Sequence, residues 1–348
     1  MMSRHTAQVG AVIAAFVVMH IASASSLDAQ QRSARQRVHA AQPPRAKQSR
    51  PVKPAEPPPL PCGDIVSFQV LLDHQGFSPG EIADRPTRNL ARALRALQAA
   101  RGLPPTGEPD CDTWHRLGGD TSGPTTTVYT ISDDDMNGPF QPKIPRDLVA
   151  QATLETLAYR SPIEKLGERF HVSPALLERM NSGIAIAAGR EIKVPAVQPF
   201  DPDTEPTTDA AAADVTIHVT REESALRVTR ADGTLVFFAP VTTGSEHDPL
   251  PQGDWAVRGV QWLPAFHYNP QLFWDAKPQD TKVTIKPGPN NPVGVVWIDL
   301  TLEHYGLHGT PEPGRIGMTE SHGCVRLTNW DAARVTAFVQ PGTPVLFR

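Results

Sequence analysis

The sequence predicts a multidomain α+β protein that ends in a mostly β sandwich with one flanking helix. Apolar residues recur at helical spacing within residues 62–118, which predicts a small helical bundle. Two Ser-Pro helix starts between short β-type runs predict a strand, helix, helix, strand module over residues 127–197. Short β-type runs separated by Gly and Pro fill residues 214–348, which favours a sandwich or barrel.

The N-terminal region has the pattern of an export signal. Arg4 and His5 precede an apolar run from Val9 to Ile21, and a small-residue cleavage pattern follows at 22–24. We expect a signal peptide over residues 1–24, because the run is shorter than a membrane-spanning helix. No transmembrane segment is expected after cleavage, so the predicted location is periplasmic or otherwise extracytoplasmic. Residues 25–61 are rich in Pro, Arg and Gln, and we expect a disordered tether.

The chain has three cysteines. In an oxidising compartment outside the cytoplasm, three cysteines suggest one disulfide and one remaining thiol. Cys62 precedes the first predicted helix of the bundle, and Cys111 precedes the last one near residues 113–117. We expect these two to be bonded to each other. Cys324 then remains a free thiol.

The second polar break, residues 198–213, combines prolines, acids and an alanine run and predicts an interdomain linker. The formal net charge is −4, which gives no case for a nucleic-acid partner. The chain is expected to act as a monomer.

The elements of residues 214–348 are short. Asp232-Gly233 is a hairpin turn signal between two β-type runs. One helix is expected over Asn329 to Val339, with Thr328 as its cap and Asp331 three residues later. The expected strands are the runs VTIHV, ALRVTR, TLVFFAP, WAVRGV, VVWIDL and TPVLF.

Cys324 stands in the segment SHGCVRL, and its chemistry depends on its neighbours. A thiol is mostly neutral at physiological pH, so a nucleophilic cysteine needs a base; His308 and His322 are both candidates. We expect a nearby imidazolium to lower the thiol pKa. Amides around Gly323 could form an oxyanion site, and Arg326 could hold a substrate carboxylate or fix the loop.

Zinc binding by Cys324, His308 and His322 is an alternative, since thiolate and imidazole are preferred zinc ligands. No second cysteine pairs with Cys324 at ligand spacing, so we expect neither a metal nor another cofactor. A purely structural cysteine is a further alternative, which the flanking histidines and Gly323 disfavour.

The segments HGT and SHGCVRL together resemble the catalytic signature of the YkuD-type L,D-transpeptidases, and the resemblance extends through LPQGDWAVRG, PGPNNPVGVVWIDL and TNWDAARV. It covers residues 214–348 and implies a β-sandwich-like catalytic domain. The resemblance implies that Cys324 is the nucleophile and His308 the general base. It further implies that the Gly309 carbonyl orients the base, that His322 and Gly323 line the oxyanion site, and that Ser321 and Arg326 shape the substrate-binding loop.

The resemblance also implies the reaction. The family acts on peptidoglycan stem peptides through a cysteine thioester, releases the terminal D-alanine and forms a 3-3 cross-link with an amine of a neighbouring stem. Water as acceptor would give an L,D-carboxypeptidase, and a protein lysine would attach that protein to the wall. A non-catalytic peptidoglycan-binding protein is the alternative from another class.

Two N-terminal segments carry further resemblances. Residues 62–118, through GLPPTGEPDCDTW and the helices before it, are similar to the helical peptidoglycan-binding domain of cell-wall hydrolases. Residues 127–197, through PIEKLGERFHVSPALLERMN and AAGREIKVP, resemble a LysM module with an insertion at 132–157. Both resemblances imply glycan binding. A spacer bundle and a structural wedge are the respective alternatives.

Overall fold

The computed structural model describes residues 59–207 and 214–348. The chain from Pro58 onward is one compact unit. The predicted signal peptide and nearly all of the predicted tether lie outside the described residues. Within the described ranges, no helix is both long enough and apolar enough to cross a membrane.

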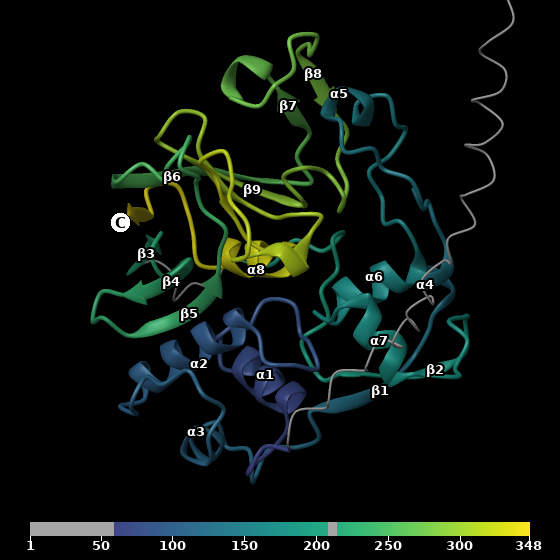
Figure 1. Ribbon diagram of the computed structural model, residues 1–348, viewed down its shortest axis with the longest axis vertical. Helices are drawn as coiled ribbons and strands as arrows, with labels where there is room; N and C mark the ends of the chain where they lie inside the picture. The colour runs from purple at the N-terminus through teal and green to yellow at the C-terminus, as the bar shows by residue number, and fades with distance from the viewer. Residues whose placement is uncertain (1–58, 208–213) are drawn as a thin grey trace, which may run out of the picture. The chain divides into compact units, whose positions relative to one another are not determined.

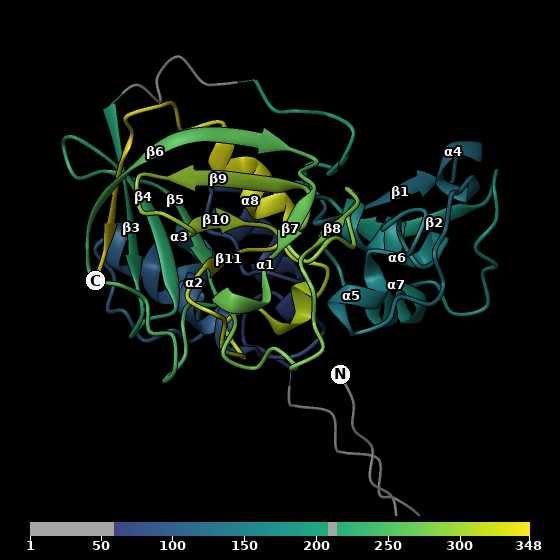
Figure 2. The ribbon, with the colours of Figure 1, turned by 90° about the horizontal axis from the view of Figure 1, so that it is seen from above.

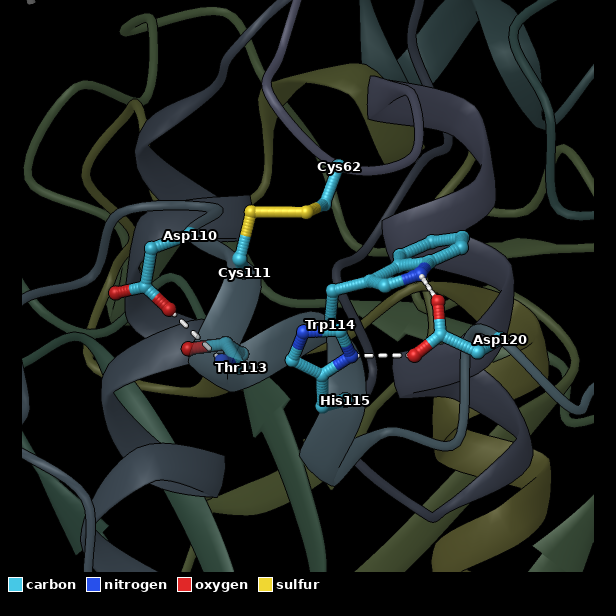
Figure 3. The surroundings of a disulfide bond; sticks show 7 residues. All are labelled: Cys62, Asp110, Cys111, Thr113, Trp114, His115 and Asp120. Atoms are coloured by element: carbon cyan, nitrogen blue, oxygen red, sulfur yellow. Dashed lines mark hydrogen bonds and ion pairs between the residues drawn. A yellow bond between two sulfur atoms is a disulfide. The ribbon is translucent and has the colours of Figure 1, made fainter.

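The N-terminal bundle has the three helices that the sequence predicts. Each begins at an aspartate or threonine whose side chain accepts hydrogen bonds from the first backbone amides of the helix. Cys62 and Cys111 are joined by a disulfide that ties the start of the bundle to its last helix (Figure 3). The helices are α1 (Ile65–His74), α2 (Arg88–Ala100) and α3 (Cys111–Arg116).

The middle module has the predicted order of strand, helix, helix and strand, and its two strands pair antiparallel. Ser161 and Ser173 cap the two helices, and a proline follows each cap at the first helical position. The insertion contains two further single-turn helices that the sequence does not signal. The elements are β1 (Thr126–Thr130), α4 (Asp133–Met136), α5 (Leu148–Gln151), α6 (Pro162–Arg169), α7 (Pro174–Met180) and β2 (Glu191–Pro195).

The C-terminal domain is mostly β with one flanking α-helix, α8 (Asn329–Thr336). Eight strands form one sheet in the order β11-β10-β9-β6-β12-β3-β4-β5, and a separate hairpin pairs β7 with β8. The strands are β3 (Val215–Thr220), β4 (Ala225–Arg230), β5 (Leu235–Pro240), β6 (Gly253–Trp262), β7 (Phe266–Tyr268), β8 (Val283–Ile285), β9 (Val296–Leu300), β10 (Gly306–His308), β11 (Val325–Arg326) and β12 (Pro344–Phe347).

The C-terminal domain is mostly β with one flanking helix, as predicted, and strand β6 belongs to both halves of its sheet. Its first residues, Gly253–Ala256, pair with β12, and its remainder pairs with β9. The register shifts between Val257 and Gly259, where the strand changes partner. A bulge of this kind bends a strand, so β6 turns from one half of the sheet into the other. Apolar residues from both halves and from α8 share one core.

The three folded pieces are packed together rather than separated. Ala225 and Phe238 of the C-terminal sheet belong to the core of the helical bundle, and α2 packs against β5 (Figure 1). Val70 and Ile82 of the bundle segment belong to the core of the middle module. The predicted linker is described as far as residue 207. Within that part, Phe200 is buried in the C-terminal core.

Helix α8 lies close to the bundle helices (Figure 1). The side chains of Asp331 and Arg334 on this helix contact the bundle. Thr328 caps the helix as predicted, but Asp331 does not complete a capping box. Its carboxyl instead accepts a hydrogen bond from Ser78 Oγ at 2.8 Å, and burial raises its pKa to about 7. Arg334 donates two hydrogen bonds to Asp73 on α1, at 2.6 and 2.9 Å.

The Asp73–Arg334 pair predicts how the modules respond to mutation and to acid. The Asp73 side chain is only 1% exposed. Although burial raises its pKa, the charges of Arg334 and His171 hold that pKa well below its ordinary value. Replacing Arg334 by leucine leaves a buried carboxylate with only the His171 ring beside it. We expect the free energy of unfolding in urea to fall by about 3–5 kcal/mol at pH 7.

The sign of the pH dependence follows from the lowered pKa. The stabilisation by Asp73 is present above the unfolded-state pKa and is lost as the pH falls below about 4. An Asp73→Asn/Arg334→Leu variant should recover part of the loss at pH 7 and should lack this component of the acid dependence. An Arg334→Leu protein as stable as the wild type would contradict the assignment.

Candidate functional site

Two short strands bring the candidate residues together. Strands β10 and β11 pair in parallel, with His308 opposite Arg326 (Figure 2). Side chains two residues apart in a strand point to the same face. Cys324 directly precedes β11, two residues from Arg326, so the register brings its backbone close to the His308–Arg326 pair. The described contacts of its thiol include the His304 carbonyl oxygen and no hydrogen bond to His308. The intervening segment, residues 309–323, is called the catalytic loop below.

His308 is held in one tautomer. Its Nδ1–H donates to the carbonyl oxygen of Gly309 at 2.7 Å, which leaves Nε2 free of its proton and able to accept one. The ring is 3% exposed and stacks on Trp297, its cross-strand neighbour, with centroids 5.5 Å apart. Burial and the nearby Arg326 charge lower the His308 pKa to about 3. His308 is therefore a neutral base at physiological pH.

Cys324 is a free thiol, and it is also neutral at rest. Burial raises its pKa above the ordinary value, although the Gly306 amide and Arg326 oppose that shift. The thiol lies 3.7 Å from the carbonyl oxygen of His304. The expectation that an imidazolium lowers the thiol pKa is therefore wrong for the resting site. Burial disfavours both charged forms, and His308 has a carbonyl rather than a carboxylate partner.

Gly323 is required by its surroundings. Its φ of +97° is in the region that glycine favours, and a Cβ atom there would lie 2.7 Å from the ring of Tyr305. Ser321 donates from Oγ to the carbonyl oxygen of Cys324 at 2.7 Å, and its own amide donates to Gly244. These contacts fix the turn that presents the Cys324 amide and sulfur.

His322 does not contact His308 but faces the segment that follows β7. Its Nε2 donates to Asp275 Oδ1 at 2.8 Å, and its ring lies beside Phe273 and Trp274. Its Nδ1 is buried and has no hydrogen-bond partner in the described part of the chain. His322 therefore has one nitrogen engaged by a carboxylate and one nitrogen that protein groups leave unused.

Arg326 is a cation whose charge acts on both the thiol of Cys324 and the imidazole of His308. Its backbone pairs with Thr242, so the strand that carries it is fixed on its other edge. Its buried Nε has no hydrogen-bond partner among residues 59–207 and 214–348. Burial lowers its pKa, although the guanidinium remains charged. It can therefore donate to an incoming anion.

The helical bundle supports the catalytic loop from outside. Asn89 donates from Nδ2 to the carbonyl oxygen of Ile316 at 2.8 Å, and Arg92 donates to that of Gly317 at 3.1 Å. The Gly317 amide donates to Thr242 Oγ1 at 2.9 Å. The loop is thus anchored to both the bundle and the sheet.

Gly309 lies against Asn329, which leaves no room for a side chain at position 309. A Cβ atom at Gly309 would lie 2.1 Å from Asn329 Oδ1. That same oxygen accepts hydrogen bonds from the amides of Val295 and Thr310, at 3.2 and 3.1 Å. The Gly309 carbonyl therefore orients His308 within a segment that Asn329 holds from behind.

No cluster of three or more His, Cys, Asp or Glu side chains suited to a metal ion is found in the described ranges. The two candidate zinc ligands besides Cys324 have other partners: His308 donates to a carbonyl and His322 to Asp275.

Comparison with known families agrees with this geometry. The profile of the YkuD family, an L,D-transpeptidase catalytic domain, matches residues 214–346, and that of a peptidoglycan binding domain matches residues 63–117. Residues 214–346 are an L,D-transpeptidase catalytic domain. The candidate thiol, base and arginine all lie within it.

Parts of the chain are similar to individual proteins. The protein named L,D-transpeptidase YkuD in Bacillus licheniformis is 27% identical over 186 residues, which is 53% of this chain and 91% of that protein. Its namesake in Bacillus subtilis is 42% identical over 57 residues, which is 16% of this chain and only 35% of that protein. Among solved structures, an L,D-transpeptidase from Mycobacterium smegmatis aligns over 50% of this chain and 84% of its own, at 16% identity and a TM-score of 0.32.

Four residues around the candidate site are not signalled by a local sequence pattern: Trp297 on His308, Tyr305 on Gly323, Asp275 on His322 and Asn329 behind Gly309. Trp297 could have been found by pairing the predicted strand VVWIDL with the segment that contains His308. The other three depend on tertiary contacts that have no local pattern.

The neutral thiol and neutral imidazole predict a distinctive pH profile. With the His308 pKa near 3, the base is unprotonated from pH 5 to 8. The rate of Cys324 acylation by a carbapenem, followed by intact mass, should be flat across that range and should rise in alkali as the thiol ionises. A decline centred near the ordinary histidine pKa of about 6.5 would contradict the buried neutral base.

Proposed function

We propose that the protein cross-links peptidoglycan stems through a thioester on Cys324. The sulfur attacks the carbonyl of the third stem residue, and its proton passes to His308 Nε2. The C–N bond to the terminal D-alanine breaks, and His308 returns the proton to the leaving amine. An amine of a second stem then attacks the thioester, which forms the 3-3 amide bond and releases the thiol. No cofactor is needed, because the thioester retains the energy of the cleaved amide.

The observation that carries this proposal is the combination of a free thiol with a base whose tautomer is fixed. Cys324 is the one cysteine outside the disulfide, and the Nδ1–H···O bond to Gly309 directs the basic nitrogen of His308 away from the backbone. Both groups are neutral, so proton transfer accompanies attack rather than preceding it. A purely structural cysteine does not require such a partner.

Arg326 supplies the means to recognise the substrate. A tetrapeptide stem ends in the carboxylate of D-alanine, which lies next to the bond that is cleaved. The buried Nε of Arg326 lacks a partner in the described part of the chain, and a carboxylate would satisfy it. Binding there would place the leaving group beside the base on the adjacent strand.

The oxyanion of the tetrahedral intermediate needs donors. The Gly323 and Cys324 amides lie in the turn that Ser321 and Tyr305 fix. We assign these two amides to the oxyanion site. His322 could add a donor there only as an imidazolium, because its Nε2–H already donates to Asp275 and a neutral ring has no second proton.

The N-terminal modules would keep the enzyme on its polymer. Residues 63–117 match a peptidoglycan binding domain. The middle module has a β1–β2 pair flanking two helices, which is the element order of the LysM module that its sequence resembles. We propose that both contribute to binding of peptidoglycan outside the cytoplasm.

The test uses purified protein and disaccharide-tetrapeptide fragments of peptidoglycan. We expect D-alanine release together with 3-3 cross-linked dimers, and we expect Cys324→Ala to lose both while keeping wild-type thermal unfolding. Treatment with a carbapenem is the control: the wild type should gain a covalent adduct in the intact-mass spectrum, and Cys324→Ala should not.

The products separate the alternatives by mass. Tripeptides without dimers would indicate a carboxypeptidase, and protein-linked muropeptides would indicate attachment of proteins to the wall. Binding of peptidoglycan without any product, or a Cys324→Ala protein that still cross-links, would overturn the proposal.

A further inference from the structure

A buried carboxyl of the middle module reaches the catalytic domain behind the base. Glu168, on α6, is 9% exposed, and its Oε1 accepts a hydrogen bond from Asn329 Nδ2 at 2.7 Å. Asn329 is fully buried at the start of α8. The contact joins residues that lie 161 positions apart in the chain.

Both the nitrogen and the oxygen of the Asn329 side-chain amide make hydrogen bonds. Its Nδ2 also donates to the carbonyl oxygen of Pro289 at 3.2 Å, and its Oδ1 accepts from the amides of Val295 and Thr310. The oxygen is so close to the backbone that a Cβ atom at Gly294 or Gly309 would lie 2.0 or 2.1 Å away. The backbone around His308 therefore has room for the Asn329 oxygen only because positions 294 and 309 are glycines.

The Asn329 side-chain amide is connected to the His308 imidazole through the Gly309–Thr310 peptide. Thr310, whose amide it holds, follows Gly309, and the Gly309 carbonyl accepts Nδ1–H of His308. If the Asn329 amide rotated, the Thr310 amide would lose its partner, and the peptide that orients His308 would be free to tilt. A buried amide without a partner costs about 1–3 kcal/mol, so the arrangement depends on the group that fixes Asn329.

We propose that Glu168 is a positioning residue for His308, acting through Asn329 and the Gly309–Thr310 backbone. The inference rests on the proposed function of His308 as the base. It assigns to the middle module a part in the reaction, in addition to any part in binding the polymer. The catalytic domain then depends on α6 for the geometry of its base.

The surroundings of Glu168 favour its neutral form. It lines a cavity of about 30 Å³ together with Tyr159, Glu164 and Glu81, at the junction of all three folded pieces. Burial raises the pKa of Glu168 to about 8, although Tyr159 and Asn329 donate to it, and the two other carboxylates act in the same direction as burial. Glu164 is paired with Arg160, which also donates to Asn290. A glutamine at position 168 would therefore match the shape and charge of the native side chain.

The test measures acylation of Cys324 by a carbapenem, with the inactivation rate constant separated from the affinity for the carbapenem. We expect Glu168→Leu to lower the rate constant by about 10- to 100-fold with little change in affinity, because a small displacement of a catalytic group has effects of this size. Glu168→Gln should retain the wild-type rate constant, since its amide oxygen can accept from Asn329. Glu178→Leu, at an exposed position on α7, is the matched control and should also behave as wild type.

The outcomes are distinguishable. A folded Glu168→Leu protein with the wild-type rate constant would overturn the proposal, even if it were less stable, because the role would then be structural only. A Glu168→Gln protein as slow as Glu168→Leu would also overturn it. If Glu168→Leu does not fold, Glu168→Asp serves instead, because it withdraws the carboxyl from Asn329 by one methylene and should also be slow. Failure of the wild type to acylate would count against the proposed function rather than against this inference.

Discussion

The site depends on one hydrogen bond, from His308 Nδ1 to the carbonyl oxygen of Gly309. It fixes the tautomer of the base without a negative charge. A carboxylate partner would stabilise an imidazolium, whereas a carbonyl leaves a buried imidazole neutral. The half-buried thiol, whose pKa is raised, completes a pair that carries no charge at rest. Charge would appear only when the substrate is bound, where the amides near Gly323 and the guanidinium of Arg326 are placed to receive it.

That hydrogen bond needs a rigid peptide at Gly309, and the rigidity comes from outside β10 and β11, the strands at the candidate site. Asn329 holds the peptide from behind, Glu168 holds Asn329, and Asn89 holds the middle of the catalytic loop. All three folded pieces of the chain therefore meet around one loop. The pair between Asp73 of α1 and Arg334 of α8 secures the same junction.

Much of this could be predicted from the sequence, and the rest could not for a physical reason. Capping residues, such as Thr328, and apolar periodicity act locally, so helices and long strands follow from them. The pairing of Cys62 with Cys111 and the position of Cys324 beside a histidine also have local signals. Strands β10 and β11 have three and two residues, too few for a pattern. The roles of Asn329 and Glu168 depend on packing between distant segments, and the pKa values depend on burial that packing creates.

The most direct test of the central claim is the ¹⁵N NMR spectrum of the His308 imidazole in the resting enzyme. The account predicts a neutral ring with the proton on Nδ1, unchanged from pH 5 to pH 8. An imidazolium in that range, or a proton on Nε2, would contradict it.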